Sequence, residues 1–180
     1  MVYILLGTGF EEIEALAPCD LLRRASVEVQ LVGLSGRHIV GSHKISVEAD
    51  LTIEEAAHQL PELLMLPGGL GGVRSILACD AALDLIRRAW DGGKTLAAIC
   101  AAPTILAGLG IVGDRKATCY PGMEDQMGQA QMQDAATVTD GRLITGRAAG
   151  SAMEFGLRLV EHIAGAQAAE RVAKSVVYRT

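Results

Sequence analysis

The chain has 180 residues, of which 50% are hydrophobic and only 3% aromatic, so its core must be built from aliphatic side chains. This length is enough for one domain with a complete core, spanning residues 1–180. The net charge of −5 without a basic stripe argues against a nucleic-acid-binding protein, and no apolar run approaches the roughly 18 residues that would span a membrane.

The number and spacing of the cysteines indicate the redox state of the compartment in which the protein works. Four of them are widely spaced and form no CxxC motif: Cys19, Cys79, Cys100 and Cys119. The N-terminal stretch MVYILLG has no basic residues and is too short for the apolar region of a signal peptide. We therefore expect free thiols in a reducing cytoplasm. No cluster of histidine and cysteine suggests zinc, and we expect no metal.

The first half of the chain alternates between apolar runs and helical patterns. The expected elements are a strand over Val2–Leu6, a helix over residues 11–25, a strand over residues 27–34, a small hairpin within residues 36–50 around Gly41-Ser42, and a helix that stops before Pro61. The last of these begins at the sequence TIEE, residues 52–55, which predicts a capping box.

The second half continues the alternation. The expected elements are strands over Leu63–Leu66 and Thr95–Ile99, a helix from a capping Asp80 to the DGG at 91–93, a helix after Cys100, a hairpin over residues 138–145 with a type I′ turn at Asp140-Gly141, a helix from the capping box SAME (151–154) to about Ala164, and a helix over 167–174. Strands that alternate with helices predict a mostly parallel sheet covered on both faces.

Three chemically suggestive stretches follow predicted strands. GTGFEE comes after the first strand, PGGLGG after Leu63–Leu66, and Cys100 after Thr95–Ile99. Because ligands bind at the carboxyl ends of strands in such sheets, we expect these three stretches to meet at one site.

The position of Cys100 favours a reactive thiol. A residue at a sharp turn from strand to helix is exposed at the sheet edge, and the N–H groups of a helix that begins near Ala101 favour a thiolate. Gly68 and Gly69 bring further N–H groups for an oxyanion or substrate pocket. We expect Cys100 to be the most acidic of the four thiols. The alternative is a small buried hydrophobic residue, which is our interpretation of the other three cysteines.

The sequence offers a carboxylate rather than a histidine as the base. The histidines lie in the predicted hairpin (His38, His43) or on helices (His58, His162), and none follows a strand end, so a Cys–His pair is disfavoured. Glu14 opens the first helix. Pro18 lacks an N–H, so the carbonyl of Glu14 loses its partner, and a bend there would tilt Glu14 into the site. We interpret Glu11 and Glu12 as residues that only favour the helix dipole; periodicity does not decide the role of Glu14.

Four motifs, GFEEIEALAPCDLLRRA, LMLPGGLGG, LAAICAAPTIL and GSAMEFGLRLVE, in this order and spacing, resemble the ThiJ/PfpI superfamily, and within it the parkinsonism-associated deglycase and glyoxalase branch. The resemblance covers nearly the whole chain. It implies a flavodoxin-like three-layer α/β/α sandwich and a homodimer. It further implies that Cys100 is the nucleophile and Glu14 the buried acid beside it, that the N–H groups of Gly69 and Ala101 form the oxyanion pocket, and that Asp20 and Arg24 support the first helix and the dimer contact.

The sequence departs from the family pattern at two positions. PfpI-type members have a histidine directly after the cysteine, where this chain has Ala101, so protease activity is not expected. The deglycase branch often has a pocket histidine where this chain has Tyr120, in the segment ATCYPGM. A tyrosine donates a hydrogen bond but is a poor base at neutral pH. Glu14 is then the only clear proton shuttle.

The predicted function is a cofactor-independent cysteine enzyme that converts reactive 2-oxoaldehydes, such as methylglyoxal to lactate, or acts on glycated adducts. The alternative is an oxidative-stress sensor or redox-regulated chaperone in which Cys100 is oxidised to a sulfinate. A third, weaker interpretation is a binding module with an idle pocket.

Overall fold

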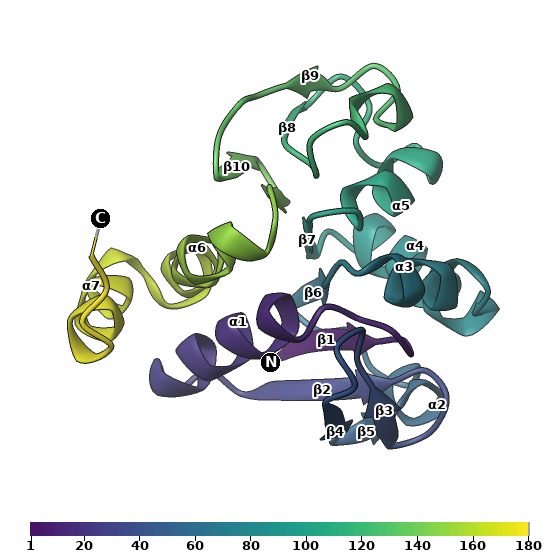
Figure 1. Ribbon diagram of the computed structural model, residues 1–180, viewed down its shortest axis with the longest axis horizontal. Helices are drawn as coiled ribbons and strands as arrows, with labels where there is room; N and C mark the ends of the chain where they lie inside the picture. The colour runs from purple at the N-terminus through teal and green to yellow at the C-terminus, as the bar shows by residue number, and fades with distance from the viewer. Residues whose placement is uncertain (180) are drawn as a thin grey trace.

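A seven-stranded sheet lies at the centre of the structure, a computed structural model that describes residues 1–179 (Figure 1). Its strands run in the order β10-β11-β7-β6-β1-β2-β5, and all neighbours are parallel except the β10–β11 hairpin. Their bounds are β1 Val2–Leu6, β2 Val29–Gly33, β5 Leu51–Thr52, β6 Leu63–Leu66, β7 Thr95–Ile99, β10 Thr137–Asp140 and β11 Leu143–Gly146. The strands β1, β6 and β7 are buried throughout, as expected for parallel strands covered on both faces.

Helices cover the two faces of this sheet. On one face lie α1 (Glu12–Arg24), α6 (Ala152–Ala164) and α7 (Ala166–Ser175); on the other lie α2 (Ile53–Ala56), α3 (Leu70–Leu77), α4 (Asp80–Asp91) and α5 (Pro103–Gly108). The side chains of β1 divide between the layers: Ile4 packs with α1 and α6, whereas Leu5 packs with α2 to α5. The predicted three-layer α/β/α sandwich is therefore confirmed. No helix within residues 1–179 is long and apolar enough to cross a bilayer.

Short elements decorate the sandwich. The antiparallel pair β3 (His38–Val40) and β4 (Ser46–Glu48) forms the predicted hairpin excursion. A small parallel pair, β8 (Lys116–Ala117) and β9 (Gln131–Met132), was not predicted, and two 3₁₀ turns lie at Glu124–Gln126 and Ala149–Ser151. These peripheral pieces lie in the connections that follow β2, α5 and β11.

The helix α3 was missed because Gly71 and Gly72 give its sequence a low helix propensity. Packing explains both glycines. A Cβ atom on Gly72 would lie 2.8 Å from the Cα of Phe10, and one on Gly71 would lie 2.9 Å from the Cα of Gly9. The two glycines let α3 approach the loop between β1 and α1, so tertiary contact outweighs local propensity.

Three predicted turn and cap details need correction, whereas the capping box of Thr52 and Glu55 is present. Asp80 is the first residue of α4 and not its cap. Ser151 makes no capping hydrogen bond, because a 3₁₀ turn leads directly into α6. The β10–β11 turn is centred on Gly141 and Arg142, and of these two only Gly141 has a positive φ (59°), a pattern of type II′ rather than type I′.

The position of α1 is fixed by a close helix crossing. A Cβ atom on Gly156 of α6 would lie 2.9 Å from the Cα of Pro18 and 2.7 Å from Leu21 Cδ1. Pro18 is buried inside α1, as the sequence indicated. Since α6 touches the backbone of α1 at this point, no side chain larger than glycine fits between the two helices without a shift.

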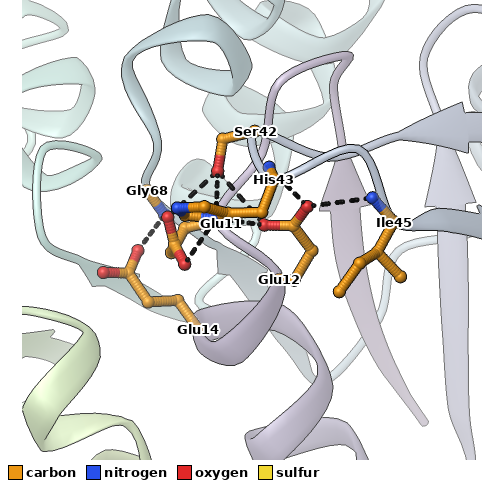
Figure 2. Close-up of polar contacts among 7 residues, drawn as sticks. All are labelled: Glu11, Glu12, Glu14, Ser42, His43, Ile45 and Gly68. Carbon is orange, nitrogen blue, oxygen red and sulfur yellow. Dashed lines mark hydrogen bonds and ion pairs between the residues drawn. The ribbon is translucent and has the colours of Figure 1, made fainter.

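The first turn of α1 also holds the β3–β4 hairpin (Figure 2). Glu12, on α1, is 3% exposed and accepts hydrogen bonds from the backbone N–H of His43 (2.7 Å) and of Ile45 (3.4 Å). Ser42 Oγ and His43 Nδ1 lie 3.1 Å and 2.9 Å from its Oε2. A Cβ atom on Gly41 would overlap this carboxylate. The interpretation of Glu12 as a mere dipole partner was wrong: it ties the hairpin to the helix.

This clamp predicts an acid-dependent stability. Burial acts to raise the pKa of Glu12, but the hydrogen bonds from His43 and the backbone lower it to about 2. A carboxyl with a lowered folded-state pKa stabilises the fold above its unfolded value, and this contribution disappears as the pH falls from about 4.5 toward 2. We expect Glu12→Gln to lower the free energy of unfolding by about 1–3 kcal/mol at pH 7, and by less at pH 3.

Urea unfolding at the two pH values measures both effects. Glu48→Gln is the matched control, because Glu48 lies on the same hairpin with an exposed side chain. It should change stability by no more than about 0.5 kcal/mol. A loss at Glu12→Gln that is equal at pH 7 and pH 3 would refute the clamp.

Candidate active site

Cys100 lies directly after β7 in a left-handed backbone conformation, with φ of 66°. A residue with a side chain adopts this region only when its surroundings hold it there. Two backbone hydrogen bonds do so: the N–H of Cys100 donates to the carbonyl of Gly146 (2.9 Å), and the N–H of Tyr120 donates to the carbonyl of Cys100 (2.8 Å). The predicted sharp turn is present, although α5 begins at Pro103 rather than near Ala101.

Glu14 and Cys100 lie on either side of Gly68. Glu14 is fully buried, and its Oε2 accepts a hydrogen bond of 2.9 Å from the N–H of Gly68 (Figure 2). A Cβ atom on Gly68 would lie 2.5 Å from that oxygen and 2.7 Å from the Cβ of Cys100. Oε1 is also buried and has no hydrogen-bond partner among the described residues. Besides burial, two side chains shift the pKa of this carboxyl: the Cys100 thiol lowers it, and the negative charge of Glu11 raises it. The site thus joins the ends of β6 and β7 with the first turn of α1.

The Glu14 carboxylate opposes the ionisation of Cys100, whereas the Cys100 thiol favours the ionisation of Glu14. Burial raises the pKa of Glu14 to about 7, although its contacts with Cys100 and the Gly68 N–H act to lower it. Burial, followed by the charge of Glu14, raises the pKa of the Cys100 thiol to about 12, against the effect of the N–H groups of Ala101 and Gly69. The pair therefore accommodates one negative charge near neutral pH, and its titration belongs to both groups.

The expectation that Cys100 is the most acidic thiol is wrong, because burial and then the charge of Glu14 raise the pKa of its thiol to about 12. That expectation counted the backbone N–H groups but omitted burial and the neighbouring charge. Burial also raises the pKa of Cys119, to about 11, and that of Cys19. When Glu14 holds a proton, its charge no longer opposes the thiolate, whereas the N–H groups still favour it. The reactivity of Cys100 then depends on where the shared proton lies.

The backbone N–H groups at the site interact either with the Glu14 carboxyl or with the Cys100 sulfur. Gly69 is the N-cap of α3 with φ of 82°, and its N–H and that of Ala101 interact with the sulfur. The N–H of Gly68 is occupied by Glu14, so it does not serve a substrate as the sequence suggested. Position 68 requires glycine because there is no room for a side chain between Glu14 and Cys100.

An open pocket of about 450 Å³ lies over the sulfur. Tyr120, 48% exposed, lines it as expected from its place in the sequence. The full lining is mostly apolar and consists of Glu11, Gly69, Leu70, Cys100, Ala101, Tyr120, Pro121 and Met123. Glu11 was interpreted only as a residue that favours the helix dipole, although its place in the GTGFEE stretch was a signal that it lies at the site. In the structure it directly precedes α1, and its N–H donates to the carbonyl of Gly68 (3.0 Å).

The other predicted residues do not line this pocket. Asp20 and Arg24 form an exposed ion pair of 2.6 Å along α1. His43 contacts the pocket lining through Glu11, because its Nδ1 lies 3.5 Å from Glu11 Oε1. Ligand atoms of Glu11, Glu12 and His43 lie within 4.8 Å of one another, which is a spacing suited to a cation. Because Glu12 is occupied by the hairpin, this group acts as a structural clamp.

Comparisons with known proteins agree with this fold and show the family. The model of the DJ-1/PfpI family matches residues 1–162. Protein dj-1beta of Drosophila melanogaster is 37% identical over 97% of this chain and 95% of its own, and its crystal structure covers 99% of this chain with a TM-score of 0.95. A protein named Deglycase PH1704, from Pyrococcus horikoshii, is 34% identical over 81% of this chain and 89% of its own.

A structure of oxidised Toxoplasma gondii DJ-1 is 28% identical and covers 99% of this chain and 98% of its own, with a TM-score of 0.95. The family match extends over most of the described sandwich and includes Glu14, Gly68 and Cys100. The ThiJ/PfpI resemblance seen in the sequence is thereby confirmed, and the chain belongs to the DJ-1/PfpI family.

Proposed function

We propose that the protein is a cofactor-independent cysteine enzyme that converts 2-oxoaldehydes to hydroxy acids, methylglyoxal to lactate being the model reaction, and that reverses early aldehyde adducts. The observation that carries this proposal is the approach of a buried carboxyl with a pKa near 7 to a thiol in a strained turn. The deglycase name of a relative from Pyrococcus horikoshii supports the same class of chemistry.

The proposed reaction begins when the Cys100 thiolate adds to the aldehyde carbon and the carbonyl oxygen takes a proton, which gives a hemithioacetal. Glu14, as carboxylate, then removes the proton from that carbon. The resulting enediolate is reprotonated at the neighbouring carbon by the same carboxyl, and the hydroxyl proton of the first carbon passes to the oxygen of the second, which leaves a thioester of the hydroxy acid. Water cleaves the thioester and restores the thiol, so the net reaction adds one water.

The backbone would stabilise the charge that develops on oxygen. The N–H groups of Gly69 and Ala101 already interact with the sulfur, and a substrate oxygen bound beside it would be within their range. Tyr120 lines the pocket and supplies a phenol donor where relatives of this branch often have a histidine. Since a phenol is a poor base at neutral pH, we assign proton transfer to Glu14 alone and expect a modest rate.

Lactate formation from methylglyoxal, without glutathione or metal, tests the proposal. We expect Cys100→Ala to abolish turnover and Glu14→Gln to lower kcat by about 10²- to 10⁴-fold, because the amide keeps a donor but has no proton to transfer. Cys79→Ser is the matched control, since Cys79 is a half-buried thiol outside the pocket lining. Turnover by Glu14→Gln at the wild-type rate would exclude Glu14 as the shuttle.

A second candidate function is redox sensing or a redox-regulated chaperone. The oxidised Toxoplasma gondii relative favours it. In this role peroxide converts the Cys100 thiolate to a sulfinate, and protonated Glu14 donates a hydrogen bond to it. Intact mass and peptide mapping after peroxide treatment would show a gain of two oxygen atoms confined to Cys100. Equal oxidation of Cys79 would argue against this function.

The proposed working form is a cytoplasmic homodimer. This proposal rests on the family resemblance, which assigns Asp20 and Arg24 to the dimer contact, and these two residues form an exposed ion pair on α1, the helix that also carries Ile13, 56% exposed. Light scattering should give twice the 18.9 kDa mass of the chain. A single-chain mass at micromolar concentration would refute the dimer.

A further inference from the structure

Glu11 is the one charged side chain among the described residues that line the Cys100 pocket. The remaining lining is backbone, the thiol and apolar or aromatic side chains, including Leu70, which is 62% exposed at the rim. The pocket volume of about 450 Å³ falls in the range of sites that bind molecules much larger than a three-carbon aldehyde. Among these lining side chains, Glu11 is therefore the one that brings a carboxylate charge to the pocket.

The structure holds this carboxylate in a fixed place. The Glu11 side chain is 16% exposed, and its Oε2 accepts a hydrogen bond of 3.0 Å from Ser42 Oγ. Its backbone N–H donates to the carbonyl of Gly68, and a Cβ atom on Gly69 would lie 2.6 Å from its nitrogen. Glu11 is thus locked to the loop that supplies the Gly69 N–H to the sulfur.

The charge of Glu11 is only weakly compensated. Ser42 has one hydroxyl proton, and Glu11 Oε2, Glu12 Oε2 and His43 Nδ1 all lie within 3.1 Å of its oxygen. His43 Nδ1 is closer to Glu12 Oε2 (2.9 Å) than to Glu11 Oε1 (3.5 Å), and its side chain is 68% exposed, so solvent screens that contact. Glu12 takes the stronger partners, and the negative charge of Glu11 remains effective in the pocket.

We propose that Glu11 sets the charge preference of the Cys100 pocket, which selects electrophiles that carry an ammonium group or are neutral with an apolar segment, and disfavours those with a carboxylate or phosphate. The inference deepens the proposed function and, as a statement about substrates, rests on it. Suitable substrates are aldehyde adducts on amines beside a positive charge, such as those on lysine-containing peptides. Anionic oxo compounds such as glyoxylate are poor substrates.

Three methanethiosulfonates of similar size test the charge preference without turnover. They bear an ethyltrimethylammonium, a hydroxyethyl or an ethylsulfonate group. In each case the thiolate attacks the sulfenyl sulfur, a disulfide forms and methanesulfinate leaves. Rates at Cys100 are measured by peptide mass in a Cys79→Ser background, and the neutral reagent corrects for any change in the thiolate fraction.

We expect Glu11→Gln to lower the ratio of cationic to anionic rates by about three- to tenfold at low ionic strength, because one unit charge is removed from the wall of the pocket that the reagents enter. The difference should shrink at about 1 M salt, where the Debye length is about 3 Å. Glu54→Gln, which changes an exposed carboxylate on α2, is the control and should leave the ratio unchanged.

An unchanged ratio in Glu11→Gln would overturn the inference. The outcomes separate the two proposals, because the reagents require only a thiolate. If the ratio falls but methylglyoxal is not turned over, the proposed reaction is wrong and the charge preference of the pocket stands. If methylglyoxal is turned over but the ratio does not change, only the role of Glu11 is lost.

Discussion

Glu14 and Cys100 meet across Gly68 in a space that accommodates one negative charge. Burial raises the pKa of both groups, and the ionised carboxyl raises that of the thiol further. The glycine is what permits the approach, since a Cβ atom there would lie 2.5 Å from Glu14 Oε2 and 2.7 Å from the Cβ of Cys100. The reactivity of the Cys100 sulfur therefore depends on whether a proton lies on Glu14, which is 86 residues away in the sequence (100 − 14).

The rest of the fold holds these two residues together. Parallel pairing of β6 with β7 and with β1 brings three strand ends to one edge of the sheet. Gly156 lets α6 contact α1 at Pro18, and Glu12 fixes the hairpin against the first turn of the same helix. A buried carboxyl that resists ionisation costs stability near neutral pH, and this dense packing offsets the cost. The same packing also holds the backbone of Cys100 in its strained left-handed conformation.

Much of this could be predicted from the sequence because it depends on local patterns. The buried runs at β1, β6 and β7 and the capping box at Thr52 identified the sheet and a helix start. The helix α3 could not be predicted, since its glycines serve a contact with Phe10 that periodicity does not show. Glu12 and Glu11 were assigned to the helix dipole because their partners lie about 30 residues away on the hairpin. The thiol pKa was misjudged because burial is a property of the whole fold.

The most direct test of the shared charge is the pH dependence of iodoacetamide alkylation at Cys100, compared between the wild type and Glu14→Gln. Alkylation follows the thiolate population, so a pair with one charge gives a rate that rises with a midpoint near pH 7, where the first proton has half dissociated, and reaches a plateau about one to two pH units higher. The height of the plateau reports how the proton divides between sulfur and carboxyl. In Glu14→Gln this lower step should be absent, and the rate should follow a single thiol titration that levels off only above the pKa of the thiol. Identical pH profiles for the two proteins would show that Glu14 does not share the proton of Cys100, and would contradict the account.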